Sequence, residues 1–266
     1  MSQRGRTASG PTPAVETTIL SVRAAHKAYG AVQALRGADF SLAAGEIHAV
    51  CGDNGAGKST LIKLIAGVEQ PDAGEILVRG RPCRFATPHD ALAAGIATIH
   101  QDLGLAPRMA IYQNIFMGSE LTRRILGVGL LDRPEMIRRS RGFLGRLGST
   151  LSDMTAPVET LSGGQRQAVA ICRALRWKAE IIVMDEPTAA LGVRETEQVL
   201  KLIRQLKETG VTVILVSHNM NDVVAVADRV TLLSAGRTAE TLATAGLTAQ
   251  ALSQTILSKG VQAVGA

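Results

Sequence analysis

Apolar residues along this chain gather in short runs that are separated by polar turns. Several runs have the length of a strand and few polar positions, as expected for strands covered on both faces of a sheet. The strand-like runs are residues 19–24, 47–51, 75–78, 96–99, 180–184 and 211–216. Stretches with the 3.6-residue spacing of amphipathic helices lie at 61–66, 168–177, 194–207 and 220–227. The alternation of strands and helices predicts an α/β fold with a mostly parallel core sheet.

Shorter elements complete the expected fold. They are strands at 33–35 and 38–42, a helix at 88–94 with Thr87 as its N-cap, a hairpin of 229–233 with 237–240, and a final helix at 247–257. The strands before residue 43 predict a small antiparallel β subdomain. Helices and glycine-broken loops at 103–160 indicate an inserted helical subdomain, whose clearest helix is 136–147. We expect a disordered tail at 1–17, one domain at 18–258 and a loose end at 259–266.

The composition narrows the classes of protein that fit. The 266 residues are 46% apolar but only 3% aromatic, so the core must consist of Ala, Val, Ile and Leu. Twenty-nine Lys and Arg against 23 Asp and Glu give a charge of +6, which favours an anionic partner such as nucleotide, nucleic acid or membrane surface. No apolar run reaches about eighteen residues, and the polar first residues do not resemble a secretory signal. Three cysteines without metal-ligand spacing favour the reducing cytoplasm.

A glycine-rich segment between a strand and a helix carries the strongest chemical signal. It reads Gly52, Asp53, Asn54, Gly55, Ala56, Gly57, Lys58, Ser59 and Thr60. In this context, glycines let consecutive backbone N–H groups turn toward an anion at the positive end of the helix. The alternative is a glycine-rich turn that binds nothing. The pattern predicts the phosphate-binding loop of an ATPase, in which Lys58 reaches the β- and γ-phosphates, Ser59 holds Mg²⁺ and Thr60 donates to the α-phosphate.

Polar residues at the ends of three other strands are candidates to complete this site. Asp185 and Glu186 follow a buried strand, where adjacent acids are expected to face a cation or water in the ligand-binding crevice. We assign Asp185 to Mg²⁺ through its water shell and Glu186 to the general base that takes a proton from the attacking water. Gln101 could reach Mg²⁺ or that water, and His218 could contact a γ-phosphate. For each residue the alternative is a solvated or structural role.

Other features are weak when taken alone. The segment 161–167 begins a helix with serine and glycine, which would make a second anion site in one chain. Tyr29, in the loop between the first two strands, is either a turn residue or an aromatic residue that stacks on a purine. Arginines between 123 and 146 could touch nucleic acid or lipid headgroups. Without interleaved aromatic residues, a solvated face is the more common arrangement.

Taken in order, the phosphate loop, Gln101, the 161–167 segment, the two acids and His218 resemble the ATP-binding subunit of an ABC transporter. The resemblance covers residues 19–240 and is specific, because other phosphate-loop ATPases lack the Leu-Ser-Gly-Gly-Gln signature before the carboxylate strand. It implies a head-to-tail dimer with two ATP molecules at the interface. Each ATP would lie on residues 52–60 of one subunit and under the signature of the other. The signature residues of this chain are Ser162, Gly163, Gly164 and Gln165.

The resemblance also implies roles for single residues and a set of partners. Tyr29 matches the aromatic residue that stacks on adenine, and Gln101 matches the glutamine that senses the metal and the membrane partner. Glu186 matches the general base and His218 the switch histidine. The implied partners are a second copy of the chain, a multi-span membrane permease and, indirectly, an external sugar-binding protein, with ATP and Mg²⁺ bound and no nucleic acid. The chain would be peripheral, on the cytoplasmic face of the inner membrane.

One departure from the family pattern changes what is expected of the dimer. Most such ATPases read Ser-Ala-Leu-Asp where this chain reads Ala-Ala-Leu-Gly, so Gly192 replaces the aspartate that crosses the interface. The segments 113–118 and 188–196 are similar to importers of ribose, xylose and fructose, and one ATPase unit matches the single-domain fructose type. Two other classes stay open. One is a soluble ABC-type ATPase acting on nucleic acid or ribosomes, and the other is a small-molecule kinase, against which the signature argues.

Overall fold

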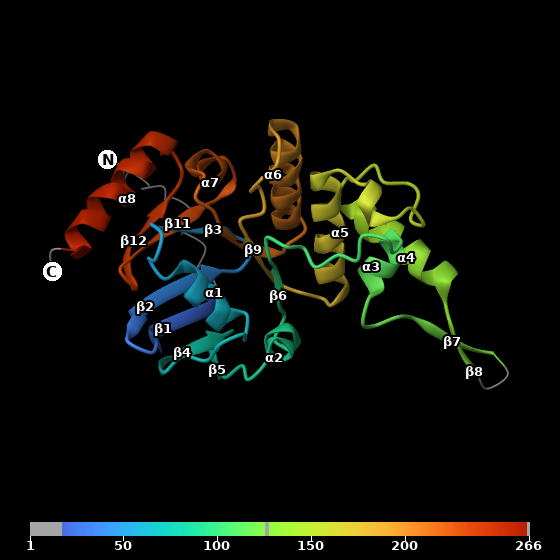
Figure 1. The fold of residues 1–266 in the computed structure, drawn as a ribbon, viewed down its shortest axis with the longest axis horizontal. Coiled ribbons are helices and arrows are strands. Elements are labelled where there is room, and N and C mark those ends of the chain that lie inside the picture. The colour runs from blue at the N-terminus through green and yellow to red at the C-terminus, as the bar shows by residue number, and fades with distance from the viewer. Residues whose placement is uncertain (1–17, 126–127, 265–266) are drawn as a thin grey trace, which may run out of the picture.

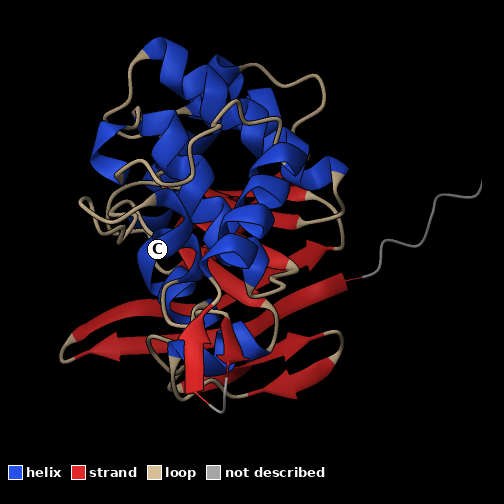
Figure 2. Cartoon of the chain, turned by 90° about the vertical axis from the view of Figure 1, so that its right-hand side faces the viewer, coloured by secondary structure: helices blue, strands red, loops and turns tan. Residues whose placement is uncertain are grey.

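The computed structural model describes residues 18–125 and 128–264, so the tail expected at 1–17 lies outside the described residues. Within them, a mixed sheet occupies the middle and an antiparallel sheet lies beside it (Figure 1). Most helices gather on the side of the middle sheet that faces away from the antiparallel sheet (Figure 2). The α/β class with a mostly parallel core sheet and a small antiparallel sheet is therefore confirmed.

The middle sheet has the strand order β12-β11-β3-β10-β9-β6. Its strands are β3 (Ile47–Cys51), β6 (Ile96–Ile99), β9 (Ile181–Asp185), β10 (Thr212–Val216), β11 (Arg229–Ser234) and β12 (Arg237–Ala243). Neighbours pair in parallel except β12, which is antiparallel to β11. Along β9, Ile181 and Val183 enter one hydrophobic core while Ile182 and Met184 enter the other, as the two-residue period of a strand requires. Burial on both faces explains the apolar runs of the sequence.

The antiparallel sheet has the order β2-β1-β4-β5. It covers one side of the hydrophobic core that also contains Ile181 and Val183 of β9. Its strands are β1 (Thr18–Tyr29), β2 (Val32–Ala43), β4 (Ala73–Val78) and β5 (Arg81–Cys83). The sequence predicts two strands at 33–35 and 38–42, but β2 is continuous. Gly37 adopts a φ of 86° inside β2, and the pairing of β1 with β2 shifts register between Val22 and His26. The ladder therefore continues through a bulge instead of ending there.

The helices that pack on the middle sheet alternate with its strands along the chain. They are α1 (Lys58–Ile65), α2 (Pro88–Ala93), α5 (Gly163–Arg176), α6 (Val193–Glu208), α7 (Met220–Val226) and α8 (Ala249–Val264). Helix α2 begins as predicted, with the Asp90 carboxylate accepting a hydrogen bond from the Thr87 N–H at 2.9 Å. Over the described residues, no helix combines the length and the apolarity that crossing a lipid bilayer would require.

The C-terminal helix differs from the sequence prediction at both ends. It begins after Thr248, whose hydroxyl accepts a hydrogen bond from the Ala251 N–H at 3.1 Å and caps the helix. It ends at Val264, so 259–264 are helical where the sequence predicts a loose end. The single glycine at 260 does not end the helix, because a glycine inside a helix costs only about 1 kcal/mol relative to alanine.

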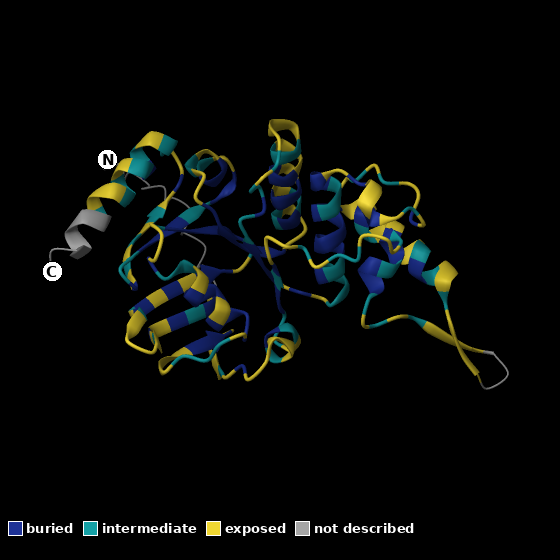
Figure 3. Ribbon diagram, viewed as in Figure 1, coloured by how far each residue is buried: buried dark blue, intermediate teal, exposed yellow. Residues whose placement is uncertain are grey.

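The segment 103–160 holds more than the predicted helices and loops. It contains α3 (Ile111–Phe116), α4 (Arg133–Arg146), a 3₁₀ turn (Val158–Thr160) and the strands β7 (Thr122–Ile125) and β8 (Val128–Leu131). The two strands form an antiparallel hairpin that projects from the helices and is exposed (Figure 3). Its arginines and glycines break the alternation by which a strand is recognised. Helix α4 starts before residue 136, because Asp132 accepts a hydrogen bond from the Glu135 N–H at 3.2 Å.

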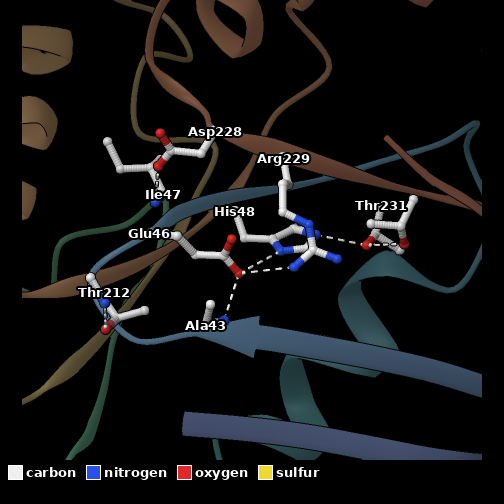
Figure 4. Close-up of polar contacts among 10 residues, drawn as sticks. Ala43, Glu46, Ile47, His48, Thr212, Asp228, Arg229 and Thr231 are labelled. Carbon is white, nitrogen blue, oxygen red and sulfur yellow. Dashed lines mark hydrogen bonds and ion pairs between the residues drawn. The ribbon is translucent and has the colours of Figure 1, made fainter. Parts of the chain in front are cut away.

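A buried polar cluster ties the two sheets together (Figure 4). Glu46 accepts a hydrogen bond from the N–H of Ala43, at the end of β2, at 2.6 Å and lies 3.0 Å from Nδ1 of His48. On the other side of the ring, Nε2 of His48 lies 2.7 Å from the hydroxyl of Thr231 in β11. Burial alone would raise the pKa of Glu46. The contacts with His48 and the Ala43 N–H, together with the charge of Arg229, outweigh burial and hold the pKa below 4.5, its ordinary value.

We predict that Glu46→Gln lowers the free energy of unfolding by roughly 1–3 kcal/mol at neutral pH, since it keeps the size of the side chain and removes a buried, hydrogen-bonded charge. A lowered pKa in the folded state means that the charge stabilises the protein above pH 4.5 and that this contribution is lost as the pH falls through the folded pKa. The difference between wild type and variant should therefore shrink in acid. Urea unfolding at about pH 7 and about pH 4 measures it.

Glu75→Gln is the matched control, because Glu75 pairs with Arg23 on the surface, where both side chains are exposed. Its cost should stay below about 1 kcal/mol at either pH. A Glu46→Gln protein as stable as wild type, or a difference that does not change with pH, would contradict the role given to this cluster.

Candidate functional site

The pairing registers bring the ends of four parallel strands to one edge of the middle sheet. Val216 of β10 pairs with Val50 of β3 and with Asp185 of β9, and Met184 of β9 pairs with Ile99 of β6. Within two positions of these paired residues the chain places Gly52, Gln101, Glu186 and His218. Candidates that are far apart in sequence thus leave the sheet at its carboxyl edge, where α/β proteins bind their ligands.

The glycine-rich segment forms an open loop between β3 and α1. Asp53, Asn54 and Gly55 are exposed, and α1 begins at Lys58 after Gly57, whose φ is 103°. The ammonium of Lys58 folds back over the loop and donates to the carbonyl oxygens of Gly52 at 2.7 Å and Asp53 at 3.0 Å. A positive charge and the N-terminus of a helix therefore converge on one exposed loop, which is the arrangement that binds phosphate.

Two loop glycines are required by close packing against distant parts of the chain. A Cβ atom on Gly52 would lie 2.2 Å from the carbonyl oxygen of Leu233 in β11. A Cβ atom on Gly57 would lie 2.8 Å from the carbonyl oxygen of Ala34 in β2. Gly55, by contrast, has open space around it and only its φ of 82° favours glycine. Packing thus fixes the ends of the loop and leaves its exposed middle free to meet a ligand.

Glu186 and His218 contact each other beside the loop. Oε2 of Glu186 lies 2.7 Å from Nδ1 of His218, and the N–H of Glu186 donates to the carbonyl oxygen of Val216 at 3.0 Å. Glu186 has a φ of 51°, a left-handed conformation that is rare for a residue with a side chain and is concentrated at functional sites. The carboxylate is 19% exposed and the imidazole 73% exposed, so the pair opens to solvent on the histidine side.

Asp185 is a half-buried carboxyl group that would gain from a cation. Burial raises its pKa, and the neighbouring charge of Glu186 raises it further, against the lowering effect of His100 and Lys58. Its side chain forms no ion pair with another described residue. Together with the Ser59 hydroxyl and the Gln101 amide, this carboxylate gives the hard oxygen donors that Mg²⁺ prefers. These three residues would therefore be suited to hold a magnesium ion.

The segment 161–167 begins α5 with a capping box. Ser162 accepts a hydrogen bond from the Gln165 N–H at 3.4 Å, and the Gln165 side chain accepts one from the Ser162 N–H at 3.0 Å. Ser162 is exposed. Gly163, Gln101 and Glu186 line the same pocket, which has a volume of about 300 Å³. The start of α5 therefore lies near two of the strand-end candidates.

Tyr29 does not lie in a loop, as the sequence predicts, but is the last residue of β1. The residue is 40% exposed. The ammonium groups of Lys27 and Lys63 lie 5.8 and 5.9 Å from its centroid, and Lys63 belongs to α1, the helix that follows the loop. The ring is thus available for stacking next to that helix.

Arg173 has a structural role that sequence reasoning missed. From α5, its guanidinium donates to the carbonyl oxygens of Leu103 at 2.6 Å and Gly104 at 2.8 Å. These bonds fasten the segment after Gln101 to the helix that begins with the signature. Because both acceptors are backbone atoms, no side-chain pattern in the sequence could have indicated the contact.

Cys51 lies directly before the loop, and its thiol is in an environment that makes it unreactive. Its thiol is fully buried and donates to the carbonyl oxygen of Ser217 at 3.4 Å. Burial raises its pKa to about 12, with Glu186 adding to the shift and Lys58 opposing it. Burial also raises the pKa of Cys172, whereas Cys83 is partly exposed.

Comparison with known proteins decides the family. Residues 35–189 match the family described as ABC transporter. The chain belongs to the ABC transporter family. The expectation drawn from the signature and the phosphate loop is therefore confirmed.

Relatives in the ABC transporter family match most of the length of this chain. It is 46% identical to a xylose/arabinose import ATP-binding protein of Sulfolobus acidocaldarius over 82% of its length and 86% of the relative. It is 48% identical to a fructose import ATP-binding protein of Rhizobium meliloti over the same shares. A ribose import ATP-binding protein of Escherichia coli O157:H7 is 44% identical, and there the match covers only 43% of the relative.

Solved ABC structures share the fold. A nucleotide-free ATP-binding cassette from an ABC transporter superposes with a TM-score of 0.76 at 24% identity, covering 91% of this chain and 95% of that one. A dimeric ATP-binding cassette bound to ADP and Pi superposes with a TM-score of 0.69 at 25% identity, covering 86% and 100%. This ABC chain thus has the cassette architecture over most of its length.

We predict that Gly52→Ala destabilises this ABC cassette by about 3 kcal/mol or more, because the added methyl group must displace the β11 backbone. Gly55→Ala meets no neighbour and should cost only about 1 kcal/mol, through its positive φ. Urea unfolding of both variants measures the difference. Equal costs would show that conformation alone, and not packing against Leu233, sets the glycine requirement.

We also predict that iodoacetamide labels Cys83 in the native protein and leaves Cys51 and Cys172 unmodified, because burial keeps both thiols protonated and out of reach. Mass spectrometry after labelling at about pH 8 tests this, and unfolding in urea should expose all three thiols. Native labelling of Cys51 at the rate of Cys83 would mean that the β3 end opens in solution.

Proposed function

We propose that this chain is the ATP-hydrolysing subunit of an importer of simple sugars, peripheral on the cytoplasmic face of the membrane. The observation that carries the proposal is the gathering of the phosphate loop, Asp185, Glu186 and His218 at one edge of the middle sheet in a chain of the ABC family. The names of the xylose/arabinose, fructose and ribose relatives support sugar import. The permease and an external binding protein would select the sugar.

The phosphates of ATP would lie on residues 52–60, with adenine on the exposed ring of Tyr29. Lys58 would exchange its two carbonyl contacts for the β- and γ-phosphates, which offer a stronger charged partner than a neutral carbonyl. Thr60 would donate to the α-phosphate. Ser59, Gln101 and Asp185 would hold Mg²⁺, which neutralises charge on the phosphate oxygens when bound.

Glu186 would act as the base of hydrolysis. A water oxygen attacks the γ-phosphorus, Glu186 takes a proton from that water, and the bond to the β-phosphate oxygen breaks to release ADP. Nδ1 of His218 lies 2.7 Å from Oε2 of Glu186, so the ring can hold the carboxylate in place. When both ring nitrogens carry a proton, the other nitrogen could also donate to a γ-phosphate oxygen. The left-handed backbone at Glu186 is a strained conformation of the kind that is found at active sites.

Each chain would supply half of a complete site. The exposed Ser162 and the glycines at the start of α5 would cover an ATP held on the phosphate loop of a second copy. Support comes from Ser162, the exposed N-cap residue of α5, because a helix N-terminus is an anion-binding element, and from the dimeric cassette among the structural neighbours. Closing the dimer would require ATP, and hydrolysis would open it.

A second pocket is a candidate dock for the permease. It has a volume of about 240 Å³ and lies between α1, α2, β6 and α5. Apolar residues such as Ile99 and Trp177 line it together with His100 and Arg173. Because Arg173 also holds the segment after Gln101, a permease helix seated here would sense movements at the metal site.

We predict that Glu186→Gln lowers the rate of ATP hydrolysis roughly 10²–10⁴-fold, the usual range for loss of a general base. ATP binding should persist, because the loop is unchanged, and the ATP-bound variant should accumulate as a dimer. Phosphate release and sedimentation measure the two effects.

Glu180→Gln is the matched control for this experiment. Glu180 lies at the opposite end of the same strand and pairs with Arg79 on the surface, so its ATPase rate should stay at the wild-type value. Normal hydrolysis by Glu186→Gln would remove Glu186 from the role of base. Hydrolysis that depends on nucleic acid rather than on a permease would contradict sugar import.

A further inference from the structure

The carboxylate of Glu195 lies at the start of two helices at once. Glu195 belongs to the first turn of α6, yet its Oε1 accepts a hydrogen bond from the N–H of Gly163, the first residue of α5, at 2.7 Å. Its Oε2 lies 3.4 Å from the N–H of Gly192, the residue before α6. The side chain is half-buried, and among the described residues no Lys, Arg or His forms an ion pair with it.

Helix N-termini explain how a half-buried carboxylate is tolerated there. The N–H groups of a first turn have no acceptor in their own helix, and their partial positive charge stabilises an anion. Glu195 meets such N–H groups from α5 and from the residue before α6. A hydrogen bond to a charged acceptor is stronger than one between neutral groups. Glu195 is therefore a fixed link between the two helix starts.

The two helices also approach each other closely at this point. A Cβ atom on Gly163 would lie 2.4 Å from Cδ2 of Leu191, and one on Gly164 would lie 2.8 Å from Oε1 of Gln198. Leu191 belongs to the turn at 189–192, just after the acidic pair. The start of α5 thus packs against residues 189–192 and against α6. The two glycines allow this close packing because they have no side chain.

The link leaves specific groups of the signature free for an outside ligand. Gly163 gives its N–H to Glu195, and Gln165 gives its N–H to Ser162. Within the described residues, the N–H of Gly164 remains, together with the capacity of the Ser162 hydroxyl to donate. Ser162 is exposed, whereas Gly164 is buried in the single chain, so the hydroxyl is the more accessible of the two groups.

We propose that Glu195 is a positioning residue for the signature. It holds the start of α5 against the turn at 189–192, so that the exposed Ser162 meets the partner subunit's nucleotide in a fixed geometry. The inference rests on the proposed function, because it needs two copies of the chain to close on ATP. It also gives this chain, in which Gly192 replaces the usual aspartate, a side chain that couples the signature to that turn.

The proposal predicts different effects for two substitutions at one position. Glu195→Ala leaves the N–H of Gly163 without its acceptor and should weaken the ATP-dependent dimer by at least roughly tenfold. Glu195→Gln keeps an oxygen acceptor at the same place, although a neutral and weaker one, and should therefore stay within about threefold of the parent. Neither should change ATP binding by the single chain, since the phosphate loop is untouched.

Sedimentation with ATP in a Glu186→Gln background measures the dimer, and a fluorescent ATP analogue, added at protein concentrations where chains are single, measures binding to the loop. The latter also reports whether each variant is folded. Glu197→Ala is the matched control, because Glu197 lies on the same helix and is exposed. It should behave as the parent in both measurements.

Three results would overturn the inference. They are an Ala variant that dimerises as tightly as the parent, a Gln variant as weak as the Ala variant, or an Ala variant that also loses ATP binding as a single chain. The last would indicate general damage to the fold. Failure of the parent itself to dimerise with ATP would overturn the proposed function, and this inference with it, a result that no change at 195 can imitate.

Discussion

The phosphate loop keeps its shape because the backbone of a distant hairpin presses against it. Gly236, in the turn between β11 and β12, donates its N–H to the carbonyl oxygen of Ala56 at 3.0 Å and accepts from the N–H of Arg36 at 2.8 Å. A Cβ atom on Gly236 would lie 2.8 Å from the carbonyl oxygen of Ala34. Backbone atoms of the phosphate loop, of β2 and of the β11–β12 turn therefore pack directly against one another. The loop cannot collapse onto itself, so its middle stays open to an anion.

The sequence predicted the parts of this protein whose signals are local. Burial on both faces leaves apolar runs, and these placed β3, β9 and β10; the acids after β9 stood out because they end such a run. The helix start at Thr87 was also predicted from its capping residue, whereas the capped start of α4 at Asp132 was missed. The β7–β8 hairpin was missed because its arginines and glycines carry no alternation, and α8 runs longer because a single glycine does not stop a helix.

Contacts between residues that are far apart in the chain could not be predicted from the sequence. Nothing local marks Glu46 and His48 as a buried pair, Arg173 as a clamp on backbone carbonyls, or Glu195 as the acceptor for Gly163. Each depends on which elements the fold brings together, and each partner is a backbone group or a residue of an ordinary type. The roles assigned to Tyr29, Gln101 and the signature come from the family resemblance, and in this chain they remain proposals.

Under the proposed function, a single chain carries the two unlike halves of one site. The phosphate loop with Asp185, Glu186 and His218 would form one half, and the start of α5 would form the other. Arg173 and Glu195 join the second half to the first through the segment after Gln101 and through the turn at 189–192. Through such links, a nucleotide that bridged two copies would change the arrangement within each copy, as the proposed motor for a permease requires.

Crosslinking between two differently marked copies tests this account most directly. One copy carries Asn54→Cys in the loop and the other Ser162→Cys at the start of α5, both with Cys83→Ser and Glu186→Gln. The account predicts that a short bis-maleimide joins the unlike copies when ATP is present and not when it is absent, and joins like copies in neither case. ATP binding without any joining of unlike copies would contradict it.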